Sequence, residues 1–252
     1  MVELGTVAQI WRFPVKSMGG EQVEALELGP GGAVGDRVLA VVDPAARKVL
    51  SGKRWPDLML ASARWESDEV VITLPDGTEL EAGDPGVHAA LSAWLDHEVR
   101  LGPPPADGVW PMEMHTGMSD EDTPLFDWPG PPGTWLDLAD AHFLTTASLA
   151  SIAQTYEGDF DVRRFRPTAL VEAPADDPWP EEGWGAFEVG DVACELLMPT
   201  PRCTIPSRAQ PGLARDKGIG RAIRDHHENN LGIYASVNRA GTLRVGDPVR
   251  RR

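Results

Sequence analysis

The feature of this sequence that most limits its fold is the density of residues that break regular structure. Its 252 residues include 26 glycines and 23 prolines. Glycine and proline interrupt helices and occupy turns, so this composition favours many short strands joined by turns over a helical bundle. The chain is long enough to form one large domain or two smaller ones around a buried core.

Acidic residues greatly outnumber basic ones, and this excludes some partners. The 39 Asp and Glu residues oppose 23 Lys and Arg residues, which gives a formal net charge of -16. A chain of this charge repels phosphate backbones, so we expect no nucleic-acid partner. No apolar run approaches the roughly 18 to 20 residues of a membrane span. The first residues also lack the pattern of a secretory signal. We therefore expect a cytoplasmic protein with no membrane partner.

The first half of the chain predicts strands, one hairpin and one helix. β-Branched and aromatic residues favour strands over 7–13 and 37–42, and a Pro-Asp-Gly turn at 75–77 joins two more strands over 70–74 and 78–80. Asp84 is the expected N-cap of a helix with one apolar face, formed by Val87, Leu91, Trp94 and Leu95. The stretch 102–108, with three prolines between two glycines, is a natural boundary. From there to Gly133 the chain is rich in Pro, Gly, Asp and Trp without a clear period and is expected to be a long loop.

The second half of the chain contains both helix-like and strand-like patterns. A helix capped by Thr145 or Thr146 carries Leu149 and Ile152 on its apolar face. A second helix is expected over 218–227, with Ile219, Ala222 and Ile223 facing inward. The predicted strands cover residues 165–172, 186–198, 232–237 and 242–249. The fold class is therefore mostly β with some α (α+β), in two barrel-like halves.

The two cysteines differ in their surroundings. Cys194 alternates with apolar residues in a predicted strand, which is typical of a small core residue. Cys203 follows that strand and lies between Arg202 and Thr204, where adjacent positive charge favours the thiolate that attacks substrates or binds metals. The two could form a disulfide, but a cytosolic setting argues against it. Cys203 is thus the candidate functional cysteine.

Basic residues form three groups in this acidic chain: Lys16-Ser17, Arg163-Arg164-Phe165-Arg166 and Pro201-Arg202-Cys203. They could simply be surface arginines paired with the abundant carboxylates. However, Lys16-Ser17 and Arg166-Pro167-Thr168 each place a cation beside a hydroxyl, a combination that suits a phosphate group. We expect Lys16, Arg37 and Arg166 to face one anion-binding cavity with its floor near Cys203.

Several common catalytic and cofactor-binding motifs are missing. The sequence has no G-x-S-x-G nucleophile motif and no phosphate-binding P-loop, and its six histidines form no metal-binding pattern. The Gly-rich stretch 29–35 contains Pro30 and leads into a predicted strand, so it predicts a turn, not a dinucleotide-binding loop. Two cysteines are too few for the four thiolates of an ordinary iron–sulfur cluster. We expect no iron–sulfur cluster, haem or flavin in this chain.

Six short motifs occur in the same order as in a known family. They are Arg12-Phe-Pro-Val-Lys-Ser-Met18, Val34-Gly-Asp-Arg37, Phe143-Leu-Thr-Thr-Ala-Ser-Leu149, Asp161-Val-Arg-Arg-Phe-Arg-Pro167, Pro201-Arg-Cys203 and Arg244-Val-Gly-Asp-Pro248. Through these motifs the chain closely resembles the MOSC-domain proteins, together with the β-barrel domain that precedes the MOSC domain. The resemblance implies an N-terminal MOSC β-barrel domain over 1–105, a linker over 106–140 and a MOSC β-barrel domain over 141–252.

The resemblance also implies a molybdenum cofactor and its ligands. Family members bind molybdenum cofactor, and a cysteine thiolate that matches Cys203 holds the metal. The residues that match cofactor contacts or fall in segments lining that site are Lys16, Ser17, Arg37, Thr146, Ser148, Arg166, Thr168 and Arg202. At Thr168 this chain departs from the family, which usually has Asn there.

The family includes the mitochondrial amidoxime-reducing components and bacterial enzymes that detoxify N-hydroxylated bases. The resemblance therefore implies a molybdenum-dependent reductase of small N-hydroxylated, or related N- or S-oxygenated, compounds. Because no dinucleotide, flavin or cluster motif is visible, we expect an external electron-transfer protein, either ferredoxin-like or a flavoprotein. Two alternatives remain: a sulfur-transfer protein that carries a persulfide on Cys203, and a carrier of molybdenum cofactor.

Overall fold

The structure, a computed structural model, describes residues 2–106, 108–115 and 124–252. Its largest unit is a closed barrel of seven strands. In order of pairing they are β14 (Ala169–Glu172), β13 (Ala141–Thr145), β17 (Asn230–Arg239), β16 (Val192–Pro201), β15 (Ala186–Val189), β19 (Pro248–Arg251) and β1 (Val2–Arg12), which returns to β14. β2 (Glu21–Val23) extends the sheet from β1. The mostly β fold class is confirmed.

Apolar side chains fill the interior of this barrel. Phe143, Trp184 and Phe187 are fully buried, and the ring of Phe187 lies edge-on to both others, with centroid distances of 5.3 and 5.0 Å. Burial of each such ring contributes about 1.5–3 kcal/mol. Cys194 belongs to the same core and is 2% exposed, so the prediction that it is a small core residue is confirmed.

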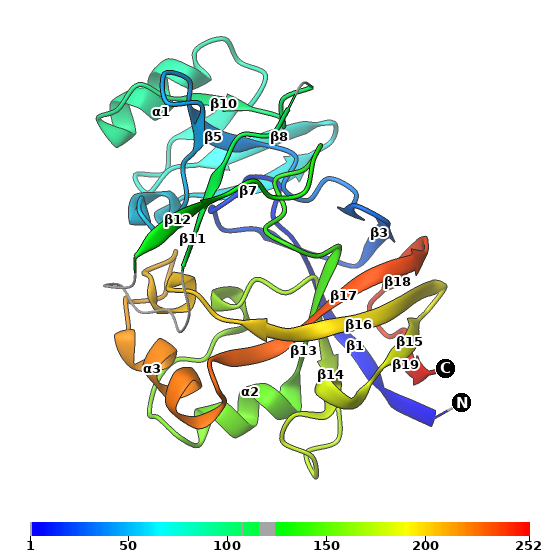
Figure 1. The fold of residues 1–252 in the computed structure, drawn as a ribbon. Coiled ribbons are helices and arrows are strands. Elements are labelled where there is room, and N and C mark those ends of the chain that lie inside the picture. Colours follow the sequence, from blue (N-terminus) through cyan, green and yellow to red (C-terminus); the bar gives the residue numbers. More distant parts are fainter. Residues whose placement is uncertain (1, 107, 116–123) are drawn as a thin grey trace.

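Two small sheets and one helix form the part of the N-terminal half that lies above the barrel in Figure 1. The sheets are β10 (Arg100–Gly102), β5 (Ala40–Asp43) and β6 (Lys48–Val49), and β7 (Ser62–Glu66), β8 (Glu69–Thr73) and β9 (Glu79–Glu81). A third small sheet lies beside the barrel and contributes Leu26, Leu28 and Leu243 to its core; its strands are β18 (Gly241–Arg244), β3 (Ala25–Gly29) and β4 (Gly32–Ala33). This half has a hydrophobic core of its own, which includes Val41, Leu58 and Ile72. α1 (Val87–Leu95) buries Val87, Leu91 and Leu95 in that core, as its periodicity predicts.

Strand pairing crosses the predicted domain boundaries. β1, from the start of the chain, closes the C-terminal barrel, while β18, from the end of the chain, pairs with β3 of the N-terminal half. The two halves therefore share strands at both ends of the sequence. The boundaries at 105 and 141 stay predictions.

Two helices cover the lower end of the barrel in Figure 1: α2 (Thr146–Ala153) and α3 (Lys217–His226). Thr145 caps α2, because its hydroxyl accepts a hydrogen bond from the backbone N–H of Ser148 at 3.1 Å. Both helices agree with the sequence pattern, and α3 buries Ile219, Ala222 and Ile223 as expected. The short 3-10 helices are η1 (Pro56–Leu60), η2 (Val162–Arg164), η3 (Pro180–Gly183) and η4 (Ile205–Ser207).

Several local predictions were wrong. The single strand expected over 186–198 is two, because the backbone turns at Gly190, where φ is +54°. The expected strands over 37–42 and 242–249 are likewise shorter or divided. The N-cap of α1 is Gly86, and Asp84 instead accepts a hydrogen bond from the backbone N–H of Gly86.

The segment expected as a long loop contains two antiparallel strands, β11 (Met112–His115) and β12 (Leu125–Trp128). Met112 is buried against Val42, Val49 and Trp135, so contacts with a distant sheet stabilise a segment whose own sequence has little strand pattern. No helix among the described residues is long and apolar enough to cross a membrane.

Candidate functional site

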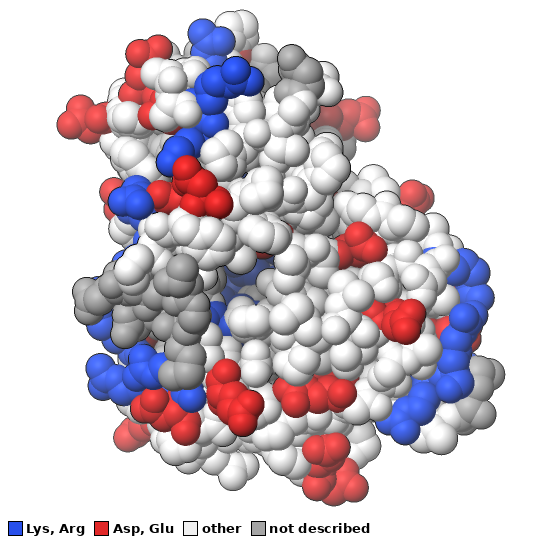
Figure 2. All heavy atoms as spheres, in the orientation of Figure 1, with Lys and Arg blue, Asp and Glu red and all other residues white. Residues whose placement is uncertain are grey.

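Segments that are far apart in the sequence meet in one cavity. Figure 2 shows Lys and Arg atoms at the bottom of a hollow in the face of the molecule. Six of the predicted site residues line this cavity: Lys16, Ser17, Arg37, Arg166, Arg202 and Cys203. The expected convergence of the basic groups on one cavity near Cys203 is therefore what the structure has. The lining residues that carried no signal in the sequence include Ser51, Lys53, Asp137, His142 and Tyr234.

Backbone pairing between two loops brings Lys16 and Arg37 together. The backbone N–H of Arg37 donates to the carbonyl of Phe13, and that of Lys16 donates to the carbonyl of Leu39, both at 2.8 Å. This short parallel contact continues as the bridge between Val15 and Leu39. The two cationic side chains thus reach the same cavity although they lie about 20 residues apart along the chain.

Two guanidinium groups lie against the ring of Phe13. The central carbon of Arg166 is 4.2 Å from the ring centroid, and that of Arg37 is 5.0 Å from it. The negative face of an aromatic ring attracts a cation placed over it, so the Phe13 ring stabilises both guanidinium groups. Burial, together with the nearby charge of Arg37, lowers the pKa of Arg166 to about 9. Arg166 therefore remains a cation at neutral pH.

Three cavity residues adopt left-handed backbone conformations. The φ angles are +67° at Ser17, +46° at Arg37 and +54° at Arg166. This region costs a residue other than glycine about 1–2 kcal/mol. Strain of this kind persists where surrounding structure enforces it, and it concentrates at functional sites. The cavity thus retains side chains at positions where glycine would be less strained.

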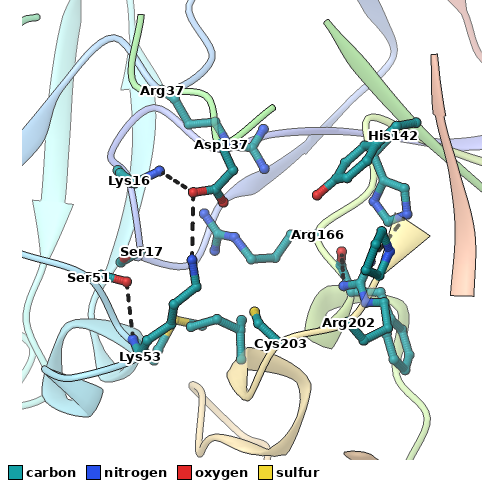
Figure 3. Close-up of a pocket in the computed structure, with 15 residues that line it drawn as sticks. Lys16, Ser17, Arg37, Ser51, Lys53, Asp137, His142, Arg166, Arg202 and Cys203 are labelled. Carbon is teal, nitrogen blue, oxygen red and sulfur yellow. Dashed lines mark hydrogen bonds and ion pairs between the residues drawn. The ribbon is translucent and has the colours of Figure 1, made fainter. Parts of the chain in front are cut away.

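Two buried lysines share one carboxylate (Figure 3). The Lys16 ammonium donates to Asp137 Oδ1 at 2.9 Å, and the Lys53 nitrogen lies 3.8 Å from the same oxygen. Burial would raise the pKa of Asp137, but the charges of Lys16 and Lys53 outweigh burial and hold it well below its usual value. Burial lowers the pKa of Lys16, an effect that Asp137 partly offsets.

Cys203 lies two residues beyond the end of β16, in a segment fixed by its neighbour Arg202. The backbone N–H of Arg202 donates to the carbonyl of Asn229 at 2.7 Å, and the Asn229 amide donates back to the carbonyl of Arg202 at 2.7 Å. The Arg202 guanidinium donates to the carbonyl of Phe165 at 2.9 Å. Cys203 itself is a free, half-buried thiol, and the apolar side chains of Met59 and Ile205 line the cavity with it.

His142 and Tyr234 also line the cavity and contact each other through their rings, with centroids 5.7 Å apart. Burial, followed by the charge of Arg202, lowers the pKa of His142 well below its ordinary value, so the imidazole is neutral. Burial raises the pKa of Tyr234 to about 12, so its hydroxyl keeps its proton at neutral pH. The cavity therefore contains a neutral imidazole and a protonated phenol beside its cations.

Three predicted site residues do not line this cavity. Thr168 accepts a hydrogen bond from the backbone of His142 at 3.1 Å and lines a neighbouring depression that shares Arg37 and Asp137 with the cavity. Thr146 accepts one from the backbone of Ala173 at 3.2 Å. Ser148 is fully buried and donates to Glu181. These last two hydroxyls satisfy backbone and side-chain groups beside α2 and lie outside the cavity. Their predicted contact with a cofactor stays a prediction.

The three arginines of the Arg163–Arg166 group also differ in position, because Arg166 lines the cavity together with Phe165, whereas Arg163 and Arg164 do not line it. Arg163 pairs with Asp161 at 2.7 Å on the outside of the molecule. Arg164 is 1% exposed and donates to backbone carbonyl groups of the loop that follows Cys203. Adjacent arginines thus serve three different purposes.

The buried Glu181 beside Thr145 and Ser148 makes a testable contribution to pH-dependent stability. Burial raises the pKa of Glu181, although hydrogen bonds from Ser148 and Thr145, both 2.7 Å, partly oppose this. A raised pKa in the folded state means that stability falls as the pH rises above the carboxyl's unfolded pKa.

Glu181→Gln keeps one acceptor oxygen and removes the ionisation. We expect the Tm of the variant to exceed that of the wild type by about 2 °C or more at pH 8 and by less at pH 4. A difference that does not grow with pH would contradict this.

Comparison with known proteins agrees with this architecture. The family model described as the MOSC N-terminal beta barrel domain matches residues 4–90, and the model of the MOSC domain matches residues 137–250. The chain is therefore a MOSC-domain protein with the N-terminal MOSC β-barrel domain.

Named relatives match along almost the whole chain. The mitochondrial amidoxime reducing component 2 of Macaca fascicularis is 26% identical over 99% of this chain and 84% of its own length. The human mitochondrial amidoxime-reducing component 1 is 26% identical over 98% and 83%. Among solved structures, the YUAD protein from Bacillus subtilis is similar at a TM-score of 0.48 and 12% identity, covering 97% of this chain and 93% of that one.

Proposed function

We propose that this protein is a reductase that binds molybdenum cofactor through Cys203 and removes oxygen from small N-hydroxylated or related N- or S-oxygenated compounds. The observation that carries the proposal is the meeting of buried cations and a free thiol in one cavity. The names of the relatives, which are amidoxime-reducing components, support the same reaction class.

The residues of the cavity fit such a cofactor. A thiolate is a soft ligand that suits molybdenum better than the hard oxygen donors that Mg²⁺ or Ca²⁺ prefer. Lys16, Lys53, Arg37 and Arg166 suit the phosphate of the pterin, because they offer several donors and a positive potential. When bound, the cofactor would supply two-electron chemistry that takes oxygen from the substrate.

The other residues of the cavity would position the reaction. Arg202, through its bonds to Asn229 and Phe165, would hold the segment that presents the Cys203 thiolate. Met59 and Ile205 would exclude water from one side of the thiolate. Tyr234 would donate a hydrogen bond, since the raised pKa of its hydroxyl keeps the proton in place. Ser17 would add a neutral hydroxyl donor to the cationic end of the cavity.

The reaction needs an external source of electrons. Cleavage of the N–O bond consumes two electrons and two protons and releases the oxygen as water. Of the two cysteines, Cys194 is in the barrel core, which leaves one thiol and no means of holding a Cys₄ cluster. We propose that a ferredoxin-like protein or a flavoprotein delivers the electrons through a small, transient interface.

The test begins with the composition of the protein purified from a molybdate-fed host. We expect about one molybdenum atom and one pterin per chain, by elemental analysis and by oxidation of the pterin to a fluorescent product. Turnover of an N-hydroxylated substrate such as benzamidoxime is then measured with reduced viologen dye, and separately with NADPH and no other protein. We expect turnover with the dye alone.

Each remaining outcome contradicts part of the proposal. Cofactor without dye-driven turnover would favour a carrier of molybdenum cofactor. Protein that contains neither molybdenum nor pterin, but gains a persulfide on Cys203 when treated with a sulfur donor, would favour sulfur transfer. Turnover with NADPH and no other protein would show that the chain itself holds a site for that cofactor.

A further inference from the structure

The cationic cavity contains one carboxylate where an anionic ligand would be expected to bind. Asp137 lies between Lys16 and Lys53, and its Oδ1 atom is 2.9 Å from one ammonium nitrogen and 3.8 Å from the other (Figure 3). Each lysine is fixed from its other side by a backbone carbonyl. Lys16 donates to that of Trp135 at 2.8 Å, and Lys53 to that of Glu113 at 2.9 Å.

The two lysines are far more buried than the carboxylate between them. Their side chains are 6% and 5% exposed, whereas the side chain of Asp137 is 41% exposed. Asp137 belongs to the irregular segment between β12 and β13, whose backbone is anchored by the buried Trp135. Rotation of the Asp137 side chain into solvent would therefore leave both ammonium groups in place, facing an open position.

A phosphate group and the Asp137 carboxylate cannot both occupy that position. Each would seek the same ammonium protons, and two anions at this separation in a partly buried site repel strongly. A phosphate bears more charge and more acceptor oxygens than a carboxylate, so it gains more from two fixed ammonium groups.

We propose that Asp137 is an internal counterion that occupies the anion position between Lys16 and Lys53 and that a bound phosphate group displaces. This inference rests on the proposed function and deepens it, because it identifies the chain's own competitor for the phosphate of the cofactor. When the cavity contains no ligand, the Asp137 carboxylate stabilises it by neutralising the two lysines. The same carboxylate lowers the affinity of the cavity for every anion. Only a group that outcompetes a carboxylate is retained.

The test compares Asp137→Asn with a matched control. The full chain is produced in a host that cannot make molybdenum cofactor, and binding of pyrophosphate is measured by titration calorimetry. Asp127→Asn is the control, because Asp127 also pairs with a lysine (Lys48, at 2.9 Å), is also partly exposed and does not line the cavity. Both variants change the net charge equally, so long-range electrostatics cancel in the comparison.

We expect Asp137→Asn to bind pyrophosphate roughly tenfold more tightly than the wild type, since it removes a repulsive charge a few ångströms away. Asp127→Asn should stay within about twofold of the wild type, as expected for an exposed pair. Without ligand, Asp137→Asn should have a lower Tm than the wild type, because two buried lysines lose their counterion. Saturating pyrophosphate should remove that deficit.

A second variant covers the case in which the amide itself perturbs the cavity. Asp137→Ser leaves the space between the lysines open and should also bind pyrophosphate more tightly than the wild type. If both Asp137 variants bind pyrophosphate as weakly as the wild type or more weakly, Asp137 orients the lysines and the inference is wrong, while the anion site stands. If neither the wild type nor any variant binds pyrophosphate, both the inference about Asp137 and the anion site of the proposed function are wrong.

Discussion

Replacing Cys203 with serine is expected to abolish reduction and release most of the molybdenum. A serine hydroxyl is a much weaker and less easily deprotonated ligand than a thiol, so the metal loses the thiolate that the cavity offers it. We expect dye-driven turnover of benzamidoxime to fall by about a hundredfold or more. Elemental analysis of the same preparation measures the retained metal.

Cys194→Ser is the matched control. Burial raises the pKa of the Cys194 thiol to about 12, and the residue lies in the barrel core, so its thiol takes no part in the chemistry. This variant should keep its molybdenum and lose about 1–3 kcal/mol of unfolding free energy, because a hydroxyl enters an apolar core. A Cys203→Ser protein with normal turnover and bound molybdenum would disprove the assignment of Cys203 as the ligand.

The largest loss of stability is expected from Arg164→Met. The Arg164 guanidinium is 1% exposed and donates to four backbone carbonyls, those of Asp159, Pro206, Arg208 and Ala214, at 2.7–3.2 Å. Methionine fills similar space but leaves these acceptors without their donors. We expect a loss of about 3 kcal/mol or more of unfolding free energy, measured by urea denaturation.

Arg163→Met provides the comparison from the adjacent position. Arg163 pairs with Asp161, and the two side chains are 39% and 27% exposed. A partly exposed pair of this kind contributes about 1 kcal/mol or less. Equal losses from the two variants would mean that the carbonyl contacts of Arg164 do not fix the loop after Cys203.

Local sequence pattern was sufficient for the elements that have a strong period of their own. The apolar faces of α1 and α3 follow from residue spacing alone, and Thr145 begins α2 because its hydroxyl satisfies a free backbone N–H. The turn at 75–77 likewise lies between β8 and β9 as predicted. Where the period was weak, as in β11 and β12, distant contacts decided the structure and the prediction was wrong.

Some residues of the candidate site could be predicted from the sequence, and others could not. Motif resemblance and residue chemistry are enough to single out Lys16, Arg37, Arg166 and Cys203, and these residues share one cavity. Lys53 carries no such signal, because it lies in the ordinary polar stretch Ser51-Gly-Lys-Arg54. Its importance comes from its 5% side-chain exposure and its distance to Asp137.

Residue types and their spacing were enough to predict the fold class, the periodic helices, the family motifs and the distinction between a core cysteine and one that lines the cavity. Each of these depends on residue type and on spacing along the chain, which a sequence records directly. Contacts between distant segments determine which of Arg163, Arg164 and Arg166 reaches the cavity, and they place a carboxylate between its two lysines. Burial and proximity are set by contacts among segments more than a hundred residues apart, such as Lys16 and Asp137. No local pattern encodes that distance.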